Sequence, residues 1–406
     1  MTAARETYDA VGIAALEDPY PAYRELRAAG PVVPAGPGTW AVTRHAEVSA
    51  LLTDPRLGHE FPDLVYRASG QPEEVTDFFR ATVLNRDAPV HTALRRAMGR
   101  LLSPRAMATL RERIDRLVGE LFARMAEHPT ADIVADLAYP LPVTVASELL
   151  GIPAADRDMV RPYAVALSRS FGTGVRAEGD LSAAAAAVRW LRDYVRALLE
   201  DRTGRAGDPL EGVLATADAG LGITADDLVD NVIFLFFAGF DTTTNLIGTG
   251  CATLLRRPDQ LALLRARPEL AGSAAEEFLR HDAPIQATAR VATAPLAVGG
   301  RTIRPNRLVV LLLGSANHDE RRFAEPERVD ITRSPNPHLG FSAGPHFCLG
   351  AALARIEAAS VFTHVAAAAR FESAGAPTRR EHTSFRGFET VPVAIGRPGC
   401  STGNAG

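Results

Sequence analysis

The long apolar segment at residues 225–255 is the feature that most constrains the fold of this 406-residue chain. Apolar residues recur in it at intervals of three and four, which predicts a helix, and the same spacing is found at 107–125, 183–199 and 349–369. Strand-like stretches are shorter and lie at 39–43, 290–298, 308–313 and 390–394. We therefore expect a mainly α protein to which small sheets are attached.

Composition narrows the classes of function. The chain is 47% hydrophobic, which allows a sizeable core, and its 44 basic and 48 acidic residues give a net charge of −4. This near balance favours neither nucleic acid nor an anionic membrane as the main partner. The N-terminal residues are polar and the uninterrupted apolar runs are too short to cross a bilayer, so we expect a cytoplasmic protein without a membrane anchor.

The 3 cysteines, Cys251, Cys348 and Cys400, are too few and too scattered for a disulfide framework. Cys348 lies in the stretch Phe341-Ser-Ala-Gly-Pro-His-Phe-Cys-Leu-Gly350, directly before a predicted helix. A thiolate is stabilised at a helix start by the helix dipole and by free backbone N–H groups. A buried structural cysteine is the usual alternative, and a zinc site would lack a second pair of ligands.

This loop resembles the haem-binding loop of the cytochrome P-450 superfamily, in its soluble bacterial form, with every position of Phe-x-x-Gly-x-His-x-Cys-x-Gly filled. The resemblance implies that Cys348 is the axial ligand of the iron of haem b, with Gly350 beside the cofactor. It also implies one domain over residues 1–406, with a triangular helical part and a smaller β-rich lobe mainly from about 30–60 and 285–315 plus 385–395. Residues 397–406 are expected to form a flexible tail.

A second motif is Glu277-Phe-Leu-Arg280, whose charged residues share one helix face. Alone, such a pair is usually a solvated surface feature. Its position ahead of the cysteine loop resembles the Glu-x-x-Arg motif of the family, and Arg328 fits the later arginine that completes a structural triad there.

A third motif, Ala238-Gly-Phe-Asp241-Thr242, lies inside the long apolar segment. The Thr242 hydroxyl can bond the carbonyl of Ala238 and bend the helix, although a tolerated polar patch is the alternative. The motif resembles the Ala-Gly-x-Asp/Glu-Thr of the family. The resemblance implies that Ala238 lies against the haem and that Thr242 and Asp241 are catalytic, with Thr242 holding dioxygen and water and Asp241 bringing protons from solvent.

Basic residues in three separate segments resemble the partners of the haem propionates. His91 and Arg95 lie four residues apart on one face of a predicted helix, and both can bond an anion. Arg290 and His346 resemble the remaining propionate partners. A lone His/Arg pair would more often be a surface feature.

The resemblance also maps a substrate pocket, to which we assign Val83, Leu84, Phe171, Phe237, Ile285 and Phe388. Each of these alone has even odds of being ordinary core. Together they imply an apolar small molecule as the substrate.

The resemblance implies a haem-thiolate monooxygenase that inserts one oxygen atom from O2 by hydroxylation or epoxidation. The basic residues are all arginine and alanine is frequent, as in GC-rich bacteria, which favours a natural product such as a polyketide or macrolide. Alternatives are a terpene or fatty-acid hydroxylase, a haem-thiolate peroxygenase, isomerase or ring-coupling enzyme, and a non-catalytic haem or ligand-binding protein.

The chain has no flavin or nicotinamide fingerprint. We therefore expect electrons from NAD(P)H to arrive through separate partners, a ferredoxin reductase and a ferredoxin. Arg96, Arg100 and Arg355 are candidates for a basic docking patch, with ordinary solvated arginines as the equally weighted alternative.

Overall fold

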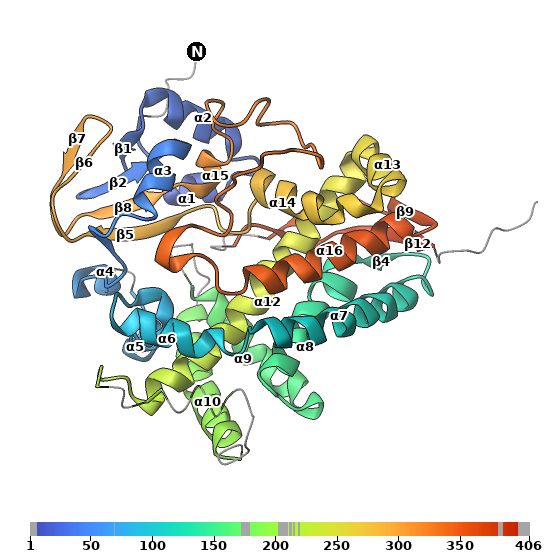
Figure 1. The fold of residues 1–406 in the computed structure, drawn as a ribbon, viewed down its shortest axis with the longest axis horizontal. Coiled ribbons are helices and arrows are strands. Elements are labelled where there is room, and N and C mark those ends of the chain that lie inside the picture. Colours follow the sequence, from blue (N-terminus) through green and yellow to red (C-terminus); the bar gives the residue numbers. More distant parts are fainter. Residues whose placement is uncertain are drawn as a thin grey trace, which may run out of the picture.

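The computed structural model describes residues 6–68, 70–171, 179–201, 210, 213, 216–217, 220–380 and 385–396. Helices form most of it (Figure 1), which confirms the mainly α class. Cys400 and the predicted tail at 397–406 lie outside the described residues. The helices are α1 (Ala10–Ala14), α2 (Tyr20–Ala29), α3 (His45–Leu51), α4 (Asp63–Ala68), α5 (Glu73–Ala81), α6 (Val90–Gly99), α7 (Pro104–Met125), α8 (Pro140–Leu149), α9 (Arg157–Arg169), α10 (Asp180–Glu200), α12 (Ala225–Arg256), α13 (Pro258–Ala266), α14 (Ala271–His281), α15 (Leu313–Ala316) and α16 (Ala351–Ala367).

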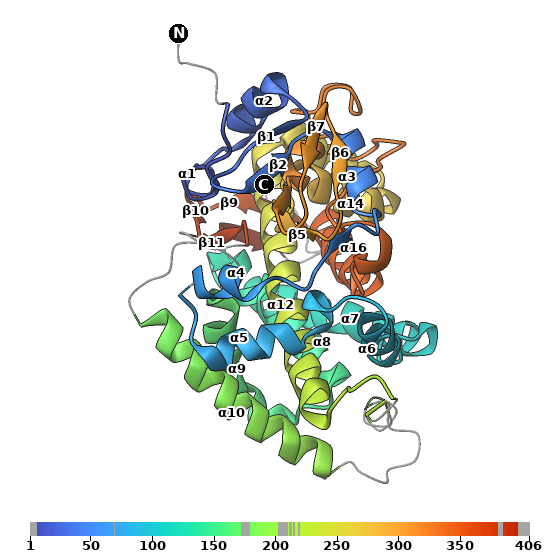
Figure 2. The same ribbon diagram turned by 90° about the vertical axis from the view of Figure 1, so that its left-hand side faces the viewer.

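Helix α12 passes through the middle of the molecule, between the strands and helices α5, α9 and α10 (Figure 2). It begins with a capping box, in which the Thr224 hydroxyl accepts the Asp227 N–H and the Asp227 carboxylate accepts the Thr224 N–H. Its length and composition would suit a membrane span, but 72% of its most apolar window is buried inside the protein, as in a core helix.

The long helices predicted from periodicity correspond to α7, α10, α12 and α16. Helix α16 packs against α7, α12 and α14, whereas α10 packs against α9 and α12. Two large apolar clusters result, one around α7, α14 and α16 and the other around α5, α9 and α10. Helix α12 contributes to both, because its apolar residues from Leu228 to Phe240 pack in the second cluster and those from Leu246 to Leu254 pack in the first.

The main sheet has 5 strands in the order β1-β2-β8-β5-β3. Its strands are β1 (Val32–Pro34), β2 (Thr39–Val42), β3 (Leu57–Gly58), β5 (Thr288–Ala292) and β8 (Leu308–Leu311). Strands β2 and β8 run parallel and the other pairs antiparallel. Side chains from this sheet, α3 and α15 share a separate core cluster.

The remaining strands form smaller sheets, β4-β12-β9, β10-β11 and β6-β7. They are β4 (Ala131–Asp132), β6 (Leu296–Val298), β7 (Arg301–Ile303), β9 (Arg370–Ser373), β10 (Thr378–Arg379), β11 (Phe388–Thr390) and β12 (Pro392–Gly396). Residues 30–60 and 285–315 thus supply the main sheet, whereas 385–395 pairs elsewhere.

The predicted strand boundaries were partly wrong. The single strand expected at 290–298 is two strands, β5 ending at Ala292 and β6 beginning at Leu296, and Pro295 between them has no N–H for a ladder. The strand at 308–313 ends at Leu311, where α15 follows. The strand at 390–394 is divided between β11 and β12.

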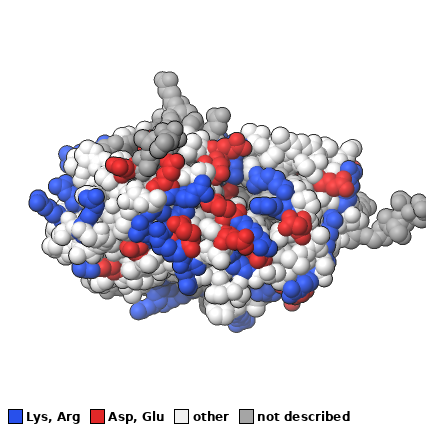
Figure 3. Space-filling model, turned by 90° about the horizontal axis from the view of Figure 1, so that it is seen from above, with Lys and Arg blue, Asp and Glu red and all other residues white. Residues whose placement is uncertain are grey.

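Charges of both signs are interspersed on the face seen in Figure 3. Pairing is common in the described structure, for example between Arg27 and Glu320 at 3.2 Å and between Arg321 and Glu320 at 2.6 Å. This mixture agrees with the nearly balanced charge of the chain.

Candidate functional site

The loop before α16 presents Cys348. Gly344 is the first residue of a short 3-10 helix, Gly344–His346, and its φ is +71°. A Cβ at this position would lie 2.7 Å from the Leu52 carbonyl oxygen. The loop therefore requires glycine here. The Cys348 N–H donates to the Phe341 carbonyl at 2.9 Å. A Cβ on Gly350 would meet open space, so the backbone there is accessible to a large group.

The Cys348 side chain is exposed, yet burial raises the pKa of its thiol above the ordinary value. Both statements hold for a side chain that has many protein atoms around it and keeps some accessible surface. The Gly350 N–H and the charges of Arg95 and Arg355 act in the opposite direction and lower the pKa. A thiol in this position ionises most readily when it coordinates a metal cation.

Basic side chains from four segments gather next to the cysteine loop. The rings of His59 and His346 stack with their centroids 3.4 Å apart, and the His91 ring lies 4.0 Å from that of His346. Nε2 of His91 is buried with no hydrogen-bond partner among the described residues. The members of this basic cluster are His59, His91, Arg95, Arg290 and His346.

The basic cluster has more positive than negative charge. Burial and the neighbouring cations lower the pKa of His346 to about 3, and they lower the pKa of His59 further. Burial lowers the pKa of Arg290 to about 10, and Asp87 opposes this shift. The Asp87 carboxylate already accepts the N–H groups of His59 and Glu60, at 3.0 Å and 3.2 Å. The cluster therefore fits a buried dianion, and the two propionates of haem have that charge.

The structure brings together all the predicted propionate partners. Arg95 joins α6 to the cysteine loop, since its guanidinium donates to the Phe347 carbonyl at 2.7 Å. Arg290 donates to the Thr288 hydroxyl at 2.7 Å and is held on β5. His59 was missed, because a single histidine after a two-residue strand has no distinctive spacing.

Helix α12 carries the other predicted motif. The Thr242 hydroxyl donates to the Ala238 carbonyl at 2.9 Å, as the sequence predicts, and Thr243 makes the same contact to Gly239 at 3.1 Å. Such bonds compete with the helix ladder and favour a local bend. Ala238 and Thr242 share a helix face, since they lie four residues apart.

Asp241 is buried and firmly held. The Ser168 hydroxyl of α9 donates to Oδ2, and the Arg380 guanidinium donates to Oδ1 at 2.6 Å. The Asn245 amide donates to the main-chain carbonyl of Asp241 at 2.8 Å. The contacts of Ser168 and Arg380 with Asp241 were not predicted, because these residues are separated from Asp241 by 73 and 139 residues and belong to no motif.

The structural triad needs one correction. Glu277 and Arg280 form a fully buried pair with two contacts of 2.8 Å, as predicted. The arginine that completes it is Arg333, whose Nε lies 3.1 Å from Glu277 Oε2. The Arg328 side chain is exposed and pairs with Glu325, and only its carbonyl contacts Arg280. Sequence spacing could not distinguish two arginines in an irregular loop.

Several predicted pocket residues lie in one aromatic group. The rings of Phe171 and Phe237 lie 6.1 Å apart, and Phe385 stacks on Phe171 at 5.2 Å. Phe385 also forms an isolated β-bridge with Ile285. Val83 packs at the margin of the same cluster as Phe237. Phe385 is the member that sequence reasoning missed.

Leu84 and Phe388 lie elsewhere. Leu84 is half-buried in the 3-10 helix at Val83–Asn85, and its carbonyl interacts with His59. Phe388 is buried in the cluster around α7 and α16, with the Arg379 guanidinium 4.0 Å from its ring centroid. It is therefore separate from the aromatic group that contains Phe237.

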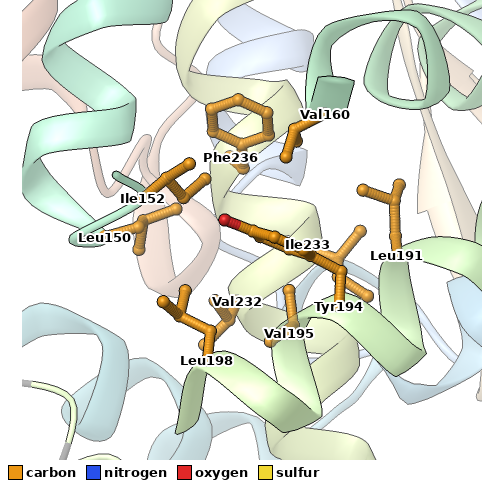
Figure 4. Close-up of a pocket in the computed structure, with 10 residues that line it drawn as sticks. All are labelled: Leu150, Ile152, Val160, Leu191, Tyr194, Val195, Leu198, Val232, Ile233 and Phe236. Carbon is orange, nitrogen blue, oxygen red and sulfur yellow. The ribbon is translucent and has the colours of Figure 1, made fainter. Parts of the chain in front are cut away.

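A small apolar gap lies between α9, α10 and α12 (Figure 4). It has room for no more than about one water molecule, and it is too small for a cofactor or a substrate. Phe236 lines it and packs against Phe240, with ring centroids 5.5 Å apart. Phe240 thus lies on the side of α12 away from Ala238 and Thr242.

Comparisons with known proteins agree with this geometry. Residues 269–391 match the family model described as Cytochrome P450. The cytochrome P450 monooxygenase PikC of Streptomyces venezuelae is 36% identical over 84% of this chain and 81% of its own length. The vitamin D(3) 25-hydroxylase of Pseudonocardia autotrophica is 35% identical over 97% of this chain and 98% of its own.

A solved structure supports the fold. The cytochrome P450 PksS of the bacillaene polyketide synthase of Bacillus subtilis 168 matches with a TM-score of 0.82 and 31% identity, over 94% of this chain and 97% of that one. With relatives of this similarity along nearly its whole length, the chain belongs to the cytochrome P450 family and is a haem-iron monooxygenase of the bacterial type.

Proposed function

We propose that this monooxygenase oxidises an apolar natural product of the polyketide or macrolide class by hydroxylation or epoxidation. In a hydroxylation, one substrate C–H bond, O2, two electrons and two protons give a C–OH group and water. The observation that carries the proposal is the exposed Cys348 thiol beside the basic cluster, together with the Asp241–Thr242 pair of α12.

The residues of the chain divide into holding and positioning roles. Cys348 would ligate the iron, and the basic cluster would bind the propionates. Gly350 and Ala238 would allow the flat ring to approach, because neither has a side chain beyond Cβ. The bound haem supplies the activation of O2, which amino-acid side chains do not provide.

Thr242 and Asp241 would manage protons. A threonine hydroxyl both donates and accepts hydrogen bonds, so Thr242 can hold dioxygen and a water molecule beside the haem. The neighbouring Asp241 carboxylate can take up and release protons and resupply this water. An intact pair of this kind favours O2 over peroxide as the oxidant.

The aromatic group of Phe171, Phe237 and Phe385 supports an apolar substrate. The polyketide assignment draws on the similarity to PksS, whose description names a polyketide synthase. A terpene or fatty-acid substrate is the alternative. Of these two, the similarity to a vitamin D(3) 25-hydroxylase favours the terpene.

A ferredoxin and its NAD(P)H-dependent reductase would supply the electrons in the cytoplasm. Arg96 of α6 and Arg100, directly after α6, are exposed and suit an acidic partner. Arg355 suits this role less well, since Glu276 binds its guanidinium at 2.8 Å and 2.9 Å.

Two measurements test the proposal. The carbon monoxide difference spectrum of the reduced protein should show the red-shifted band of thiolate ligation, and its absence would exclude Cys348 as the ligand. Absorbance titrations should then rank macrolide aglycones above vitamin D(3) and long-chain fatty acids in affinity. Tighter binding of either comparison compound would overturn the substrate assignment.

A further inference from the structure

The carboxylate of Asp241 has two partners from distant parts of the chain, in addition to a longer contact of 3.4 Å from the Asn245 amide of α12 to Oδ1. Asp241 is 5% exposed, so these contacts replace most of its hydration. Arg380, next to β10, donates to Oδ1 at 2.6 Å, and Ser168, in α9, donates to Oδ2. Each oxygen is therefore oriented by a separate element.

A second buried aspartate on α12 provides a contrast. Asp230 is 2% exposed, and Arg192 of α10 binds both of its oxygens at 2.7 Å. A single bidentate arginine is the ordinary structural solution for such a group. Asp241 differs because a hydroxyl, which can rotate and can also accept a proton, takes one oxygen.

The two holding residues adjoin the aromatic group. Phe171 follows Ser168 by three residues, and its N–H donates to the Ser168 carbonyl at 3.1 Å. The Arg380 N–H donates to the Gly387 carbonyl at 3.2 Å, which ties Arg380 to the segment that bears Phe385. The rings of Phe171 and Phe385 stack at an interplanar angle of 2°. The position of Asp241 thus depends on the same two segments that bear these rings.

Arg380 also connects Asp241 with the outside, since its side chain is 17% exposed. We propose that Ser168 and Arg380 are positioning residues that hold the Asp241 carboxylate where it exchanges protons with solvent and with Thr242. The proposal rests on the role for Asp241 stated under the proposed function.

Proton delivery can be tested without knowledge of the substrate. The holoenzyme, supplied with NADPH, a plant-type ferredoxin and its reductase, reduces O2 with electrons and protons alone. We expect Arg380→Gln to slow this O2 reduction at least about tenfold and to raise the ratio of the rates in H2O and D2O. Arg380→Lys, which keeps the charge, should restore most of the rate, and Ser168→Ala should give an intermediate value.

Arg192→Gln is the matched control, because it removes the arginine from the other buried aspartate of α12. It should leave the rate and the isotope ratio at the parent values. An infrared measurement gives a readout independent of turnover: the carboxylate band that is lost in Asp241→Asn should shift in Arg380→Gln and remain in place in Arg192→Gln.

Unchanged rate, isotope ratio and band in both Arg380→Gln and Ser168→Ala would overturn the proposal. If Asp241→Asn changes the isotope ratio but Arg380→Gln and Ser168→Ala do not, the positioning role of Arg380 and Ser168 is wrong and the proton role of Asp241 stands. If Asp241→Asn has no effect either, the proton role of Asp241 itself is wrong. Should Arg380→Gln fail to retain haem, Ser168→Ala decides, because loss of one hydroxyl leaves the ion pair intact.

Discussion

At the scale of single residues, Cys348 and Cys251 have the same chemistry in opposite environments. Cys348 is exposed beside the basic cluster, whereas Cys251 is buried and burial strongly raises the pKa of its thiol. We expect Cys348→Ser to abolish the red-shifted carbon monoxide band and Cys251→Ala to retain it. The difference spectrum of each reduced variant checks this, and loss of the band in Cys251→Ala alone would reverse the assignment.

Thr242 and Thr243 form the same back-bond to the helix, but only Thr242 shares a face with Ala238. Thr242→Ala should lower product formed per NADPH about tenfold and release peroxide instead, because it removes the hydroxyl to which we assign the organisation of protons. Thr243→Ala is the control and should stay close to the parent. Equal coupling in the two variants would remove Thr242 from the proton route.

The histidines of the basic cluster predict how stability depends on pH in the haem-free chain. The pKa of His346 is lowered from 6.5 to about 3, and those of His59 and His91 are also lowered. At pH values between about 3 and 6.5, the His346 side chain binds a proton in the unfolded chain but not in the folded chain. The free energy of unfolding should therefore fall as the pH falls from about 6.5 towards 3, by at most about 1.4 kcal/mol per pH unit for each histidine.

Urea unfolding from pH 7 to pH 4 measures this slope. His346→Gln should have a shallower slope than the parent, and bound haem should reduce the slope because its carboxylates favour protonated histidines. A haem-free chain of constant stability over this range would contradict the expectation.

At the scale of elements, the buried triad separates two arginines of one loop. Arg333 contacts Glu277, which is fully buried, whereas Arg328 pairs with Glu325 at the surface. Arg333→Met should lower the free energy of unfolding by about 2 kcal/mol, since it removes a hydrogen-bonded charge from a buried carboxylate. Arg328→Met should lower the free energy of unfolding by less than about 1 kcal/mol. Denaturant unfolding of both variants compares them, and equal losses would argue against the distinction.

Elements with a strong internal pattern could be predicted from the sequence. The period of α12 and α16 identified both helices, and the i to i−4 bond of Thr242 followed from helix geometry. The strand ends depended on pairing between distant segments, such as β5 with β3 and β8, which local patterns do not contain. Contacts between distant segments, such as Arg380 with Asp241, leave no periodic trace.

At the scale of the whole molecule, the family resemblance supplied the arrangement that periodicity alone could not. The predicted propionate partners come from α6, β5 and the cysteine loop, and only the folded chain brings them together. Haem removal should thus loosen several distant segments at once. We expect the thermal midpoint to fall by more than about 5 °C, because the ligand binds only the folded state.

Calorimetry of the holoprotein and the haem-free protein tests this expectation. Addition of haem to the haem-free protein should restore the midpoint, and a midpoint that does not depend on haem would show that the segments hold together without it. Cys348→Ser is a useful comparison, because it leaves the basic cluster available.

The attachment of Asp241 to the segments of Phe171 and Phe385 has a consequence for directed evolution. We expect a mutation that reshapes this wall to admit a new compound to displace Ser168 or Arg380 as well, and with them the Asp241 carboxylate that they bind. Selection for a broader range of substrates therefore also changes how efficiently electrons from NADPH are used for product formation. Libraries that vary residues 168–171 and 385–388 should yield variants that accept more substrates but form less product per NADPH. This loss should be avoided only where the same round of mutation supplies new hydrogen-bond partners for Asp241.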